Sequence, residues 1–360
     1  YMVSKLALNP EHPGSRFTIG SLETLKGNVR TDLMEFFADH YSADQMGLVV
    51  LANQSLDELE ALVTPLFNKV RNVDIGSSFP TEPVFSDQQL PAVLTSQTLK
   101  ETYGLAFNFP IPSTLQVYRN KPEQYLSNLI GHEGEGSLYQ LLNAKGWIES
   151  LAAGSQDFDR NTSLLTVNIQ LTEAGRDHIE EITDLLFQYL DMLRAQPPKD
   201  WLYQEQARVA ELAFRFQEKG STVGFVYQMA PKLDLFPAED LLVAPYLMEA
   251  FDPALIEKFL GYLRPDNVLL EITAPDSATD QVERWFEVPF ALEQAPLKRQ
   301  TVADAPLRLP EVNPYLPEQL DLVAADEQIM RRLIDQPELK LWLDTDIEFG
   351  TPRANMTVGL

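Results

Sequence analysis

LIGHEGEGSLYQLLNAKGWIESLAAGS, residues 129–155, is the stretch around which the fold of this chain can be interpreted. An apolar helix end leads into three glycines, Gly131, Gly134 and Gly136, and Gly146 then opens the pattern of an edge strand. Dense glycines let backbones approach closely, and an edge strand offers unpaired N–H and C=O groups that an extended peptide can join. The stretch predicts either a peptide-docking place or a helix corner whose glycines only permit tight packing. The residue pattern alone favours the corner.

Helix and strand patterns alternate on both sides of this stretch. Residues 163–171 alternate apolar and polar side chains, as the half-buried strand of an antiparallel sheet does. Ser55 and Glu58 form a capping box ahead of an apolar helical pattern. This mixture predicts an α+β fold of repeated units, each a mostly antiparallel sheet with helices packed on one face. The expected helices are 29–41, 55–71, 122–130, 179–193 and 201–216, and the expected strands are 46–52, 93–98, 103–110, 163–171 and 268–273.

Proline-rich segments divide the chain into units. We expect a first unit over residues 1–75 and a second over 76–290. Residues 291–337 are expected to form an extended linker, and 338–360 the start of a third unit, with strands at 339–344 and 354–360. Because the chain lacks a methionine at position 1 and begins on an apparent helix end, we expect it to be a piece of a longer protein.

Composition excludes several classes of partner and chemistry. The chain has 360 residues and a net charge of −25, which disfavours nucleic acids and anionic membranes as partners. It has no cysteine, so disulfides, thiolate catalysis and cysteine–metal sites are excluded. No apolar run approaches the roughly 18 residues that a membrane-spanning helix needs.

The histidines do not form a metal-binding motif. HExxH and HxxEH zinc sites need two histidines four residues apart, so that one helix face presents both nitrogens to the metal. The four histidines, His12, His40, His132 and His178, have no such spacing. We therefore expect packing or surface roles for them, and neither a metal ligand nor a catalytic residue in this chain.

Seven long stretches, in one order along the chain, carry a family resemblance. They include NPEHPGSRFTIGSLETL at 9–25 and LIGHEGEGSLYQLLNAKGW at 129–147, and the others are 40–59, 171–179, 202–219, 262–272 and 309–317. In these stretches the chain resembles the insulinase/pitrilysin family of zinc metallopeptidases in its long, four-domain form. The resemblance runs nearly end to end, which makes it more specific than any short motif.

The resemblance implies a division of labour within the parent protein. In this family zinc is held by an HxxEH motif, which would lie upstream of Tyr1. The chain would then comprise the C-terminal part of the catalytic domain (1–75), the second domain (76–290) and the start of the third, built from metallopeptidase-type units. It is expected to be inactive alone and to hold no cofactor, with zinc in the full-length parent. The implied function is the non-catalytic portion of a peptide-degrading zinc endopeptidase; the alternative is part of a zinc-less family member that serves as a peptide-binding or structural subunit.

The resemblance also changes the interpretation of the glycine stretch. Long family members hold the substrate N-terminus at an exosite in the second domain, and Glu133 would pair there with a free α-amino group while a strand joins the peptide by main-chain hydrogen bonds. Ala153 departs from the glycine of insulin-degrading-type relatives, and its methyl group would narrow the groove. The implied partners are peptides or small unfolded proteins and the remaining domains of the parent. The resemblance does not decide whether the parent is located in the periplasm or in the cytoplasm. The matching residues are Gly131, His132, Glu133, Gly134, Leu151, Ala152, Ala153 and Gly154.

Overall fold

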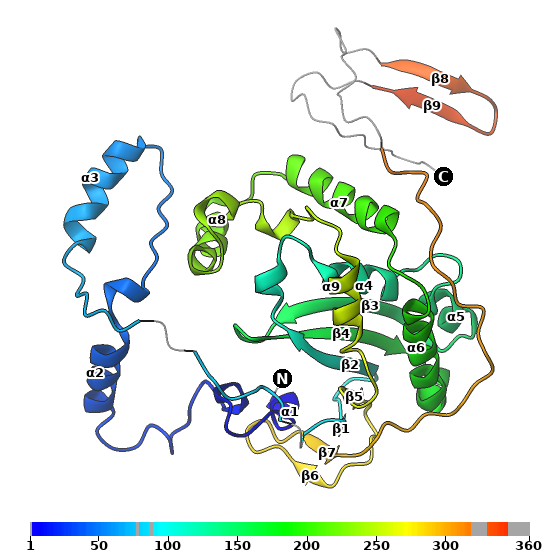
Figure 1. Cartoon of the computed structure of the whole chain (residues 1–360), viewed down its shortest axis with the longest axis horizontal. Helices are drawn as coiled ribbons and strands as arrows, with labels where there is room; N and C mark the ends of the chain where they lie inside the picture. The colour runs from blue at the N-terminus through cyan, green and yellow to red at the C-terminus, as the bar shows by residue number, and fades with distance from the viewer. Residues whose placement is uncertain (1, 77–78, 87–88, 318–329, 345–360) are drawn as a thin grey trace.

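A seven-stranded mixed sheet forms the centre of the computed structural model, which describes residues 2–76, 79–86, 89–317 and 330–344 (Figure 1). The strand order is β3-β4-β2-β5-β1-β7-β6, and every neighbouring pair is antiparallel except β1 with β5. The strands are β1 (Ala92–Ser96), β2 (Tyr103–Pro112), β3 (Ile148–Asp157), β4 (Thr162–Leu171), β5 (Leu269–Thr273), β6 (Gln281–Val282) and β7 (Pro289–Glu293).

Helices cover one face of this sheet. The alternation in β2 and β4 buries every second side chain, including Phe107, Phe109 and Val167, while the residues between them stay partly exposed. The buried side chains form one core with the apolar faces of the covering helices. The α+β prediction is therefore confirmed. The covering helices are α4 (Pro122–Ile130), α5 (Leu138–Ala144), α6 (Ile179–Arg194), α7 (Asp200–Arg215) and α9 (Pro253–Leu260). Helix α8 (Thr222–Met229) contributes no residue to this core.

Strand β3 lies at the edge of the sheet, as the sequence predicts. It pairs with β4 along one side only. Gly146, at φ +71°, forms the turn that leads from α5 into the strand, a conformation that favours glycine. The other side of β3 faces α4, and this arrangement creates the groove described below.

Residues 16–76 lie to one side of the sheet (Figure 1). They contain α2 (Val29–His40) and α3 (Leu56–Phe67), after the short α1 (Met2–Lys5), and the predicted Ser55–Glu58 capping box is present. The predicted buried strand at 46–52 is wrong: the segment is extended, pairs with no strand and exposes Leu48 and Leu51. A β-strand requires a neighbouring backbone, and the described part of the chain supplies none here.

The segment after the sheet crosses helix α6. Its apolar side chains, from Leu297 to Leu309, pack against the main core. Further on, β8 (Arg331–Asp335) and β9 (Lys340–Leu343) form a two-stranded hairpin. A strand near 339–344 is thus confirmed, and β8 lies within the range predicted as linker. The strand expected at 354–360 falls outside the described residues, and the domain boundaries stay a prediction.

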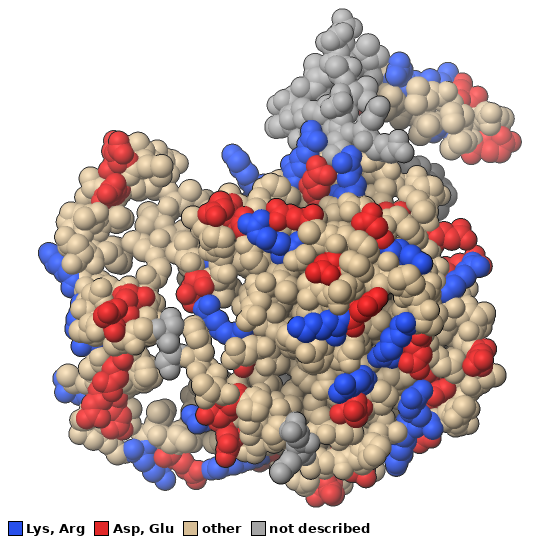
Figure 2. All heavy atoms as spheres, viewed as in Figure 1, with Lys and Arg blue, Asp and Glu red and all other residues tan. Residues whose placement is uncertain are grey.

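The visible surface mixes charges of both signs. Over the sheet and its helices, acidic and basic side chains are interspersed, without a broad basic area on this face (Figure 2). Among the described residues, no helix combines the length and apolar character that crossing a membrane requires.

Candidate functional site

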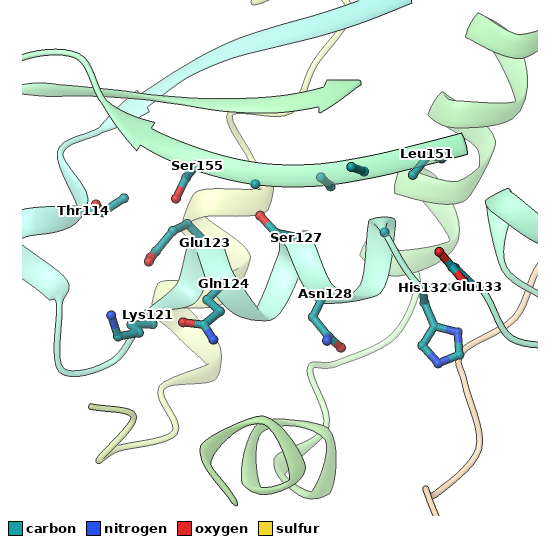
Figure 3. A pocket seen from close by; sticks show the side chains of 14 residues that line it. Thr114, Lys121, Glu123, Gln124, Ser127, Asn128, His132, Glu133, Leu151 and Ser155 are labelled. Carbon is teal, nitrogen blue, oxygen red and sulfur yellow. The ribbon is translucent and has the colours of Figure 1, made fainter. Parts of the chain in front are cut away.

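A groove of about 830 Å³ separates helix α4 from strand β3 (Figure 3). It brings together the two ends of the glycine-rich stretch, because the chain leaves α4, passes through α5 and returns as β3. Of the residues predicted for the site, all but Gly134 line it. The lining comprises Thr114, Lys121, Glu123, Gln124, Ser127, Asn128, Gly131, His132, Glu133, Leu151, Ala152, Ala153, Gly154 and Ser155.

Gly131 sets how closely α4 approaches β3. A Cβ atom on Gly131 would lie 3.1 Å from the backbone oxygen of Ser127 and 3.3 Å from the backbone nitrogen of Ala153. Both distances are tighter than ordinary van der Waals contact. Gly131 thus permits tight packing, as expected for a helix corner. The close approach of α4 to β3 also places the edge of β3 beside the glycine loop, residues 131–136.

The loop after α4 holds Glu133 at one end of the groove. The backbone N–H of Gly134 donates to Nδ1 of His132 at 3.0 Å, so Gly134 shapes the turn instead of lining the groove. Glu133 is exposed and has no hydrogen bond or ion pair to any described residue. Its neighbour Glu135 is instead paired with Arg308 at 2.6 Å. A free carboxylate therefore lies beside the edge strand.

The helix side of the groove carries polar residues that the sequence analysis missed. Glu123 is 6% and Ser127 8% exposed, and Oε2 of Glu123 and the Ser127 hydroxyl have no hydrogen-bond partner. Burial raises the pKa of Glu123 to about 7, although its own backbone N–H and Lys121 oppose the shift. Glu123 and Ser127 lie four residues apart, on one face of α4, and this spacing was the signal in the sequence.

The described residues do not fit a zinc ion. Among them, no three His, Asp or Glu side chains converge as a metal site requires. The histidines have local contacts instead: Nε2 of His12 lies 3.1 Å from Asp159, and His178 stacks on Trp147.

Replacing Ala153 by glycine should widen the groove. Ala153 is half-buried on the groove side of β3, and its Cβ lies 3.7 Å from the position a Cβ on Gly131 would take. If the groove binds an extended peptide, as the sequence predicts, Ala153→Gly should bind a peptide with a free N-terminus about two- to fivefold more tightly, since removing the methyl group opens the strand edge. Calorimetry with one octapeptide measures the change. Ala106→Gly, at a half-buried position of β2 that does not line the groove, is the matched control, and an equal gain there would show a general loosening of the sheet.

Two domain models match the chain. One is described as "Peptidase M16 inactive domain" and matches residues 28–209; the other, "Middle or third domain of peptidase_M16", matches residues 214–360. The sheet-and-helix fold thus includes a domain of the kind described as the M16 inactive domain. The chain belongs to the M16 peptidase family, the insulinase/pitrilysin family that its sequence resembles.

Individual relatives agree with this assignment. Insulin-degrading enzyme from Homo sapiens is 34% identical over 98% of this chain and 36% of its own length. A-factor-processing enzyme from Saccharomyces cerevisiae is 29% identical over 98% of this chain and 36% of its own. The crystal structure of pitrilysin superposes with a TM-score of 0.87 and 25% identity, covering 97% of this chain and 38% of that one. The chain thus spans little more than a third of these relatives.

Proposed function

We propose that this chain is the non-catalytic portion of a zinc-dependent endopeptidase and forms part of the wall of its substrate chamber. Within that wall, the α4–β3 groove is an exosite for the N-terminal segment of a peptide. Membership of the M16 family supports the peptidase role. The observation that carries the exosite is the free edge of β3 beside the unpaired carboxylate of Glu133.

An extended peptide satisfies both features of the groove at once. Its backbone joins the edge of β3 as an additional strand, which satisfies main-chain groups that are otherwise left to water. Its α-amino group, positively charged at neutral pH, pairs with Glu133. Main-chain bonding is independent of side chains, so such a site accepts many sequences while selecting for a free N-terminus.

Exposed apolar side chains on α2 and α3 support a further part of the proposal, contact with the remaining domains of the parent protein. Neither helix has a buried residue, although α3 has the apolar pattern of a core helix. Apolar surface of this extent in a soluble domain usually belongs to an interface. The exposed residues include Leu33, Met34, Phe36, Phe37, Leu62, Leu66 and Phe67.

Acetylating the N-terminus of a bound peptide tests the exosite. We expect acetylation to weaken binding to the 360-residue chain on the order of tenfold in calorimetry, because it removes a charge-assisted hydrogen bond. Glu133→Gln should weaken the free peptide similarly and leave the acetylated peptide unchanged.

Glu149→Gln provides the control, since Glu149 is an exposed residue of β3 that does not line the groove. It should preserve the preference for a free N-terminus. Equal affinity of both peptides for the native chain would contradict the role of Glu133.

A further inference from the structure

The far end of the same groove contains a buried carboxyl group that the α-amino pairing does not use. Glu123 lies in the first turn of α4, and Figure 3 shows it toward the Ser155 end of β3, whereas Glu133 lies toward the Leu151 end. Ser127, one turn further along α4, lies on the same strand-facing side. Gln124 and Asn128 point away from the strand. The groove therefore has an acidic group at each end and a hydroxyl between them.

Two unpaired polar atoms on this side of the groove are available to a ligand. Buried polar atoms in proteins are nearly always hydrogen-bonded, because leaving one unpaired is energetically unfavourable. Oε2 of Glu123 and Oγ of Ser127 are both buried, and both lack a hydrogen-bond partner. Lys121, which also lines the groove, leaves this oxygen unpaired. An incoming donor would satisfy both atoms.

We propose that Glu123 and Ser127 form a subsite for a lysine or arginine side chain of the peptide held in the groove. A cationic side chain is the ligand that a buried carboxylate with a free oxygen binds best, since the pair combines charge with hydrogen bonds. The net charge of the chain, −25, further favours cationic peptides during encounter. This inference rests on the proposed exosite and adds a sequence preference to it.

The length of the groove fixes which peptide residue reaches the subsite. From Glu123 to Gly131, the residue that follows α4, the chain spans roughly 12 Å at the helical rise per residue, which equals three or four residues of extended chain. With residue 1 of the peptide at Glu133, residue 4 or 5 lies beside Glu123. Side chains of a strand alternate between faces, so only one of these two positions points toward α4.

A lysine scan measures the preference. A free-amine octapeptide of otherwise neutral sequence receives one lysine in turn at positions 3 to 6, and glutamine at the same position serves as the reference. We expect lysine to raise affinity on the order of tenfold at position 4 or 5 and much less at the flanking positions. The advantage should disappear in Glu123→Gln and persist in Glu257→Gln, which removes an exposed charge from α9 outside the groove.

The outcomes separate this inference from the exosite itself. If acetylation weakens binding but lysine brings no advantage at any position, the exosite stands and the subsite is overturned. If lysine keeps its advantage in Glu123→Gln, the subsite is also overturned. If a peptide with glutamate at position 4 or 5, added to the series, binds more tightly than the lysine peptide, Lys121 is the anchor and the assignment is wrong. A Glu123-dependent lysine preference that acetylation leaves unchanged upholds the subsite and removes Glu133 from its role. Absence of measurable binding by every peptide overturns both proposals.

Discussion

Above pH 7, Glu123→Gln is expected to unfold at a higher urea concentration than the native chain. Glu123 is buried at the edge of the groove, and burial raises its pKa to about 7 from the ordinary 4.5. The folded protein therefore binds this proton more tightly than the unfolded chain does. Stability falls as pH rises from about 4.5 to 7 and then levels off. Glutamine has the same shape and never ionises, so it escapes this loss.

The gain in the free energy of unfolding at pH 8 should be about 3 kcal/mol at most, and it should vanish below about pH 3.5, where the carboxyl is neutral in both states. Urea unfolding followed by tryptophan fluorescence at pH 5, 6, 7 and 8 measures it. The charged groups near Glu123 are Lys121, which lowers its pKa, and Asp157, which raises it. Glu257→Gln, at an exposed position, should leave the pH profile unchanged. An unchanged profile for Glu123→Gln would show that this carboxyl ionises freely in the folded protein.

Asp184→Ala should release the segment that crosses helix α6. Asp184, in α6, is 5% exposed and accepts hydrogen bonds from Arg299 at 2.8 Å, from the N–H of Val302 at 3.2 Å and from Gln188 at 3.0 Å. Burial opposes its charge, yet these donors together hold the pKa of Asp184 below its usual value. Removing the carboxylate leaves the donors of the crossing segment without their acceptor.

We expect Asp184→Ala to lower the free energy of unfolding by about 2–3 kcal/mol. The loss is limited because Arg299 keeps partial access to water and is not left as a fully buried charge. Limited trypsin digestion should cut at Lys298 or Arg299 much faster than in the native chain. Asp191→Ala is the control from the same helix, because its pair with Arg194 is exposed and worth little. Equal digestion rates for the two variants would contradict the conclusion that Asp184 holds the crossing segment against α6.

The same segment also contacts the glycine loop. The backbone N–H of Arg308 donates to the oxygen of Gly136 at 3.0 Å, and its side chain pairs with Glu135. Gly136 has φ +81°, and a Cβ there would collide with the Arg308 side chain. Release of the segment should therefore loosen the loop that carries Glu133 and weaken peptide binding as well.

Local sequence patterns predicted an element correctly where the element's own residues show the alternation or capping that defines it. The alternation at 163–171 predicted β4, and Ser55 with Glu58 predicted the start of α3, because side-chain periodicity and capping depend on neighbours in sequence. The strand at 46–52 failed for the opposite reason. An apolar run is compatible with a buried strand, but the pairing partner belongs to another part of a fold, and the described chain provides none.

The sequence by itself determined the α+β class, the edge strand after Gly146 and, through seven matching stretches, the peptidase family. Only the tertiary structure decided that Glu123 and Ser127 face Leu151 and Ser155 across one groove. The physical reason is that burial and hydrogen-bond satisfaction are properties of a site enclosed from several sides. A glutamate in the first turn of a helix looks like an ordinary solvent-exposed cap until the strand that covers it is in place.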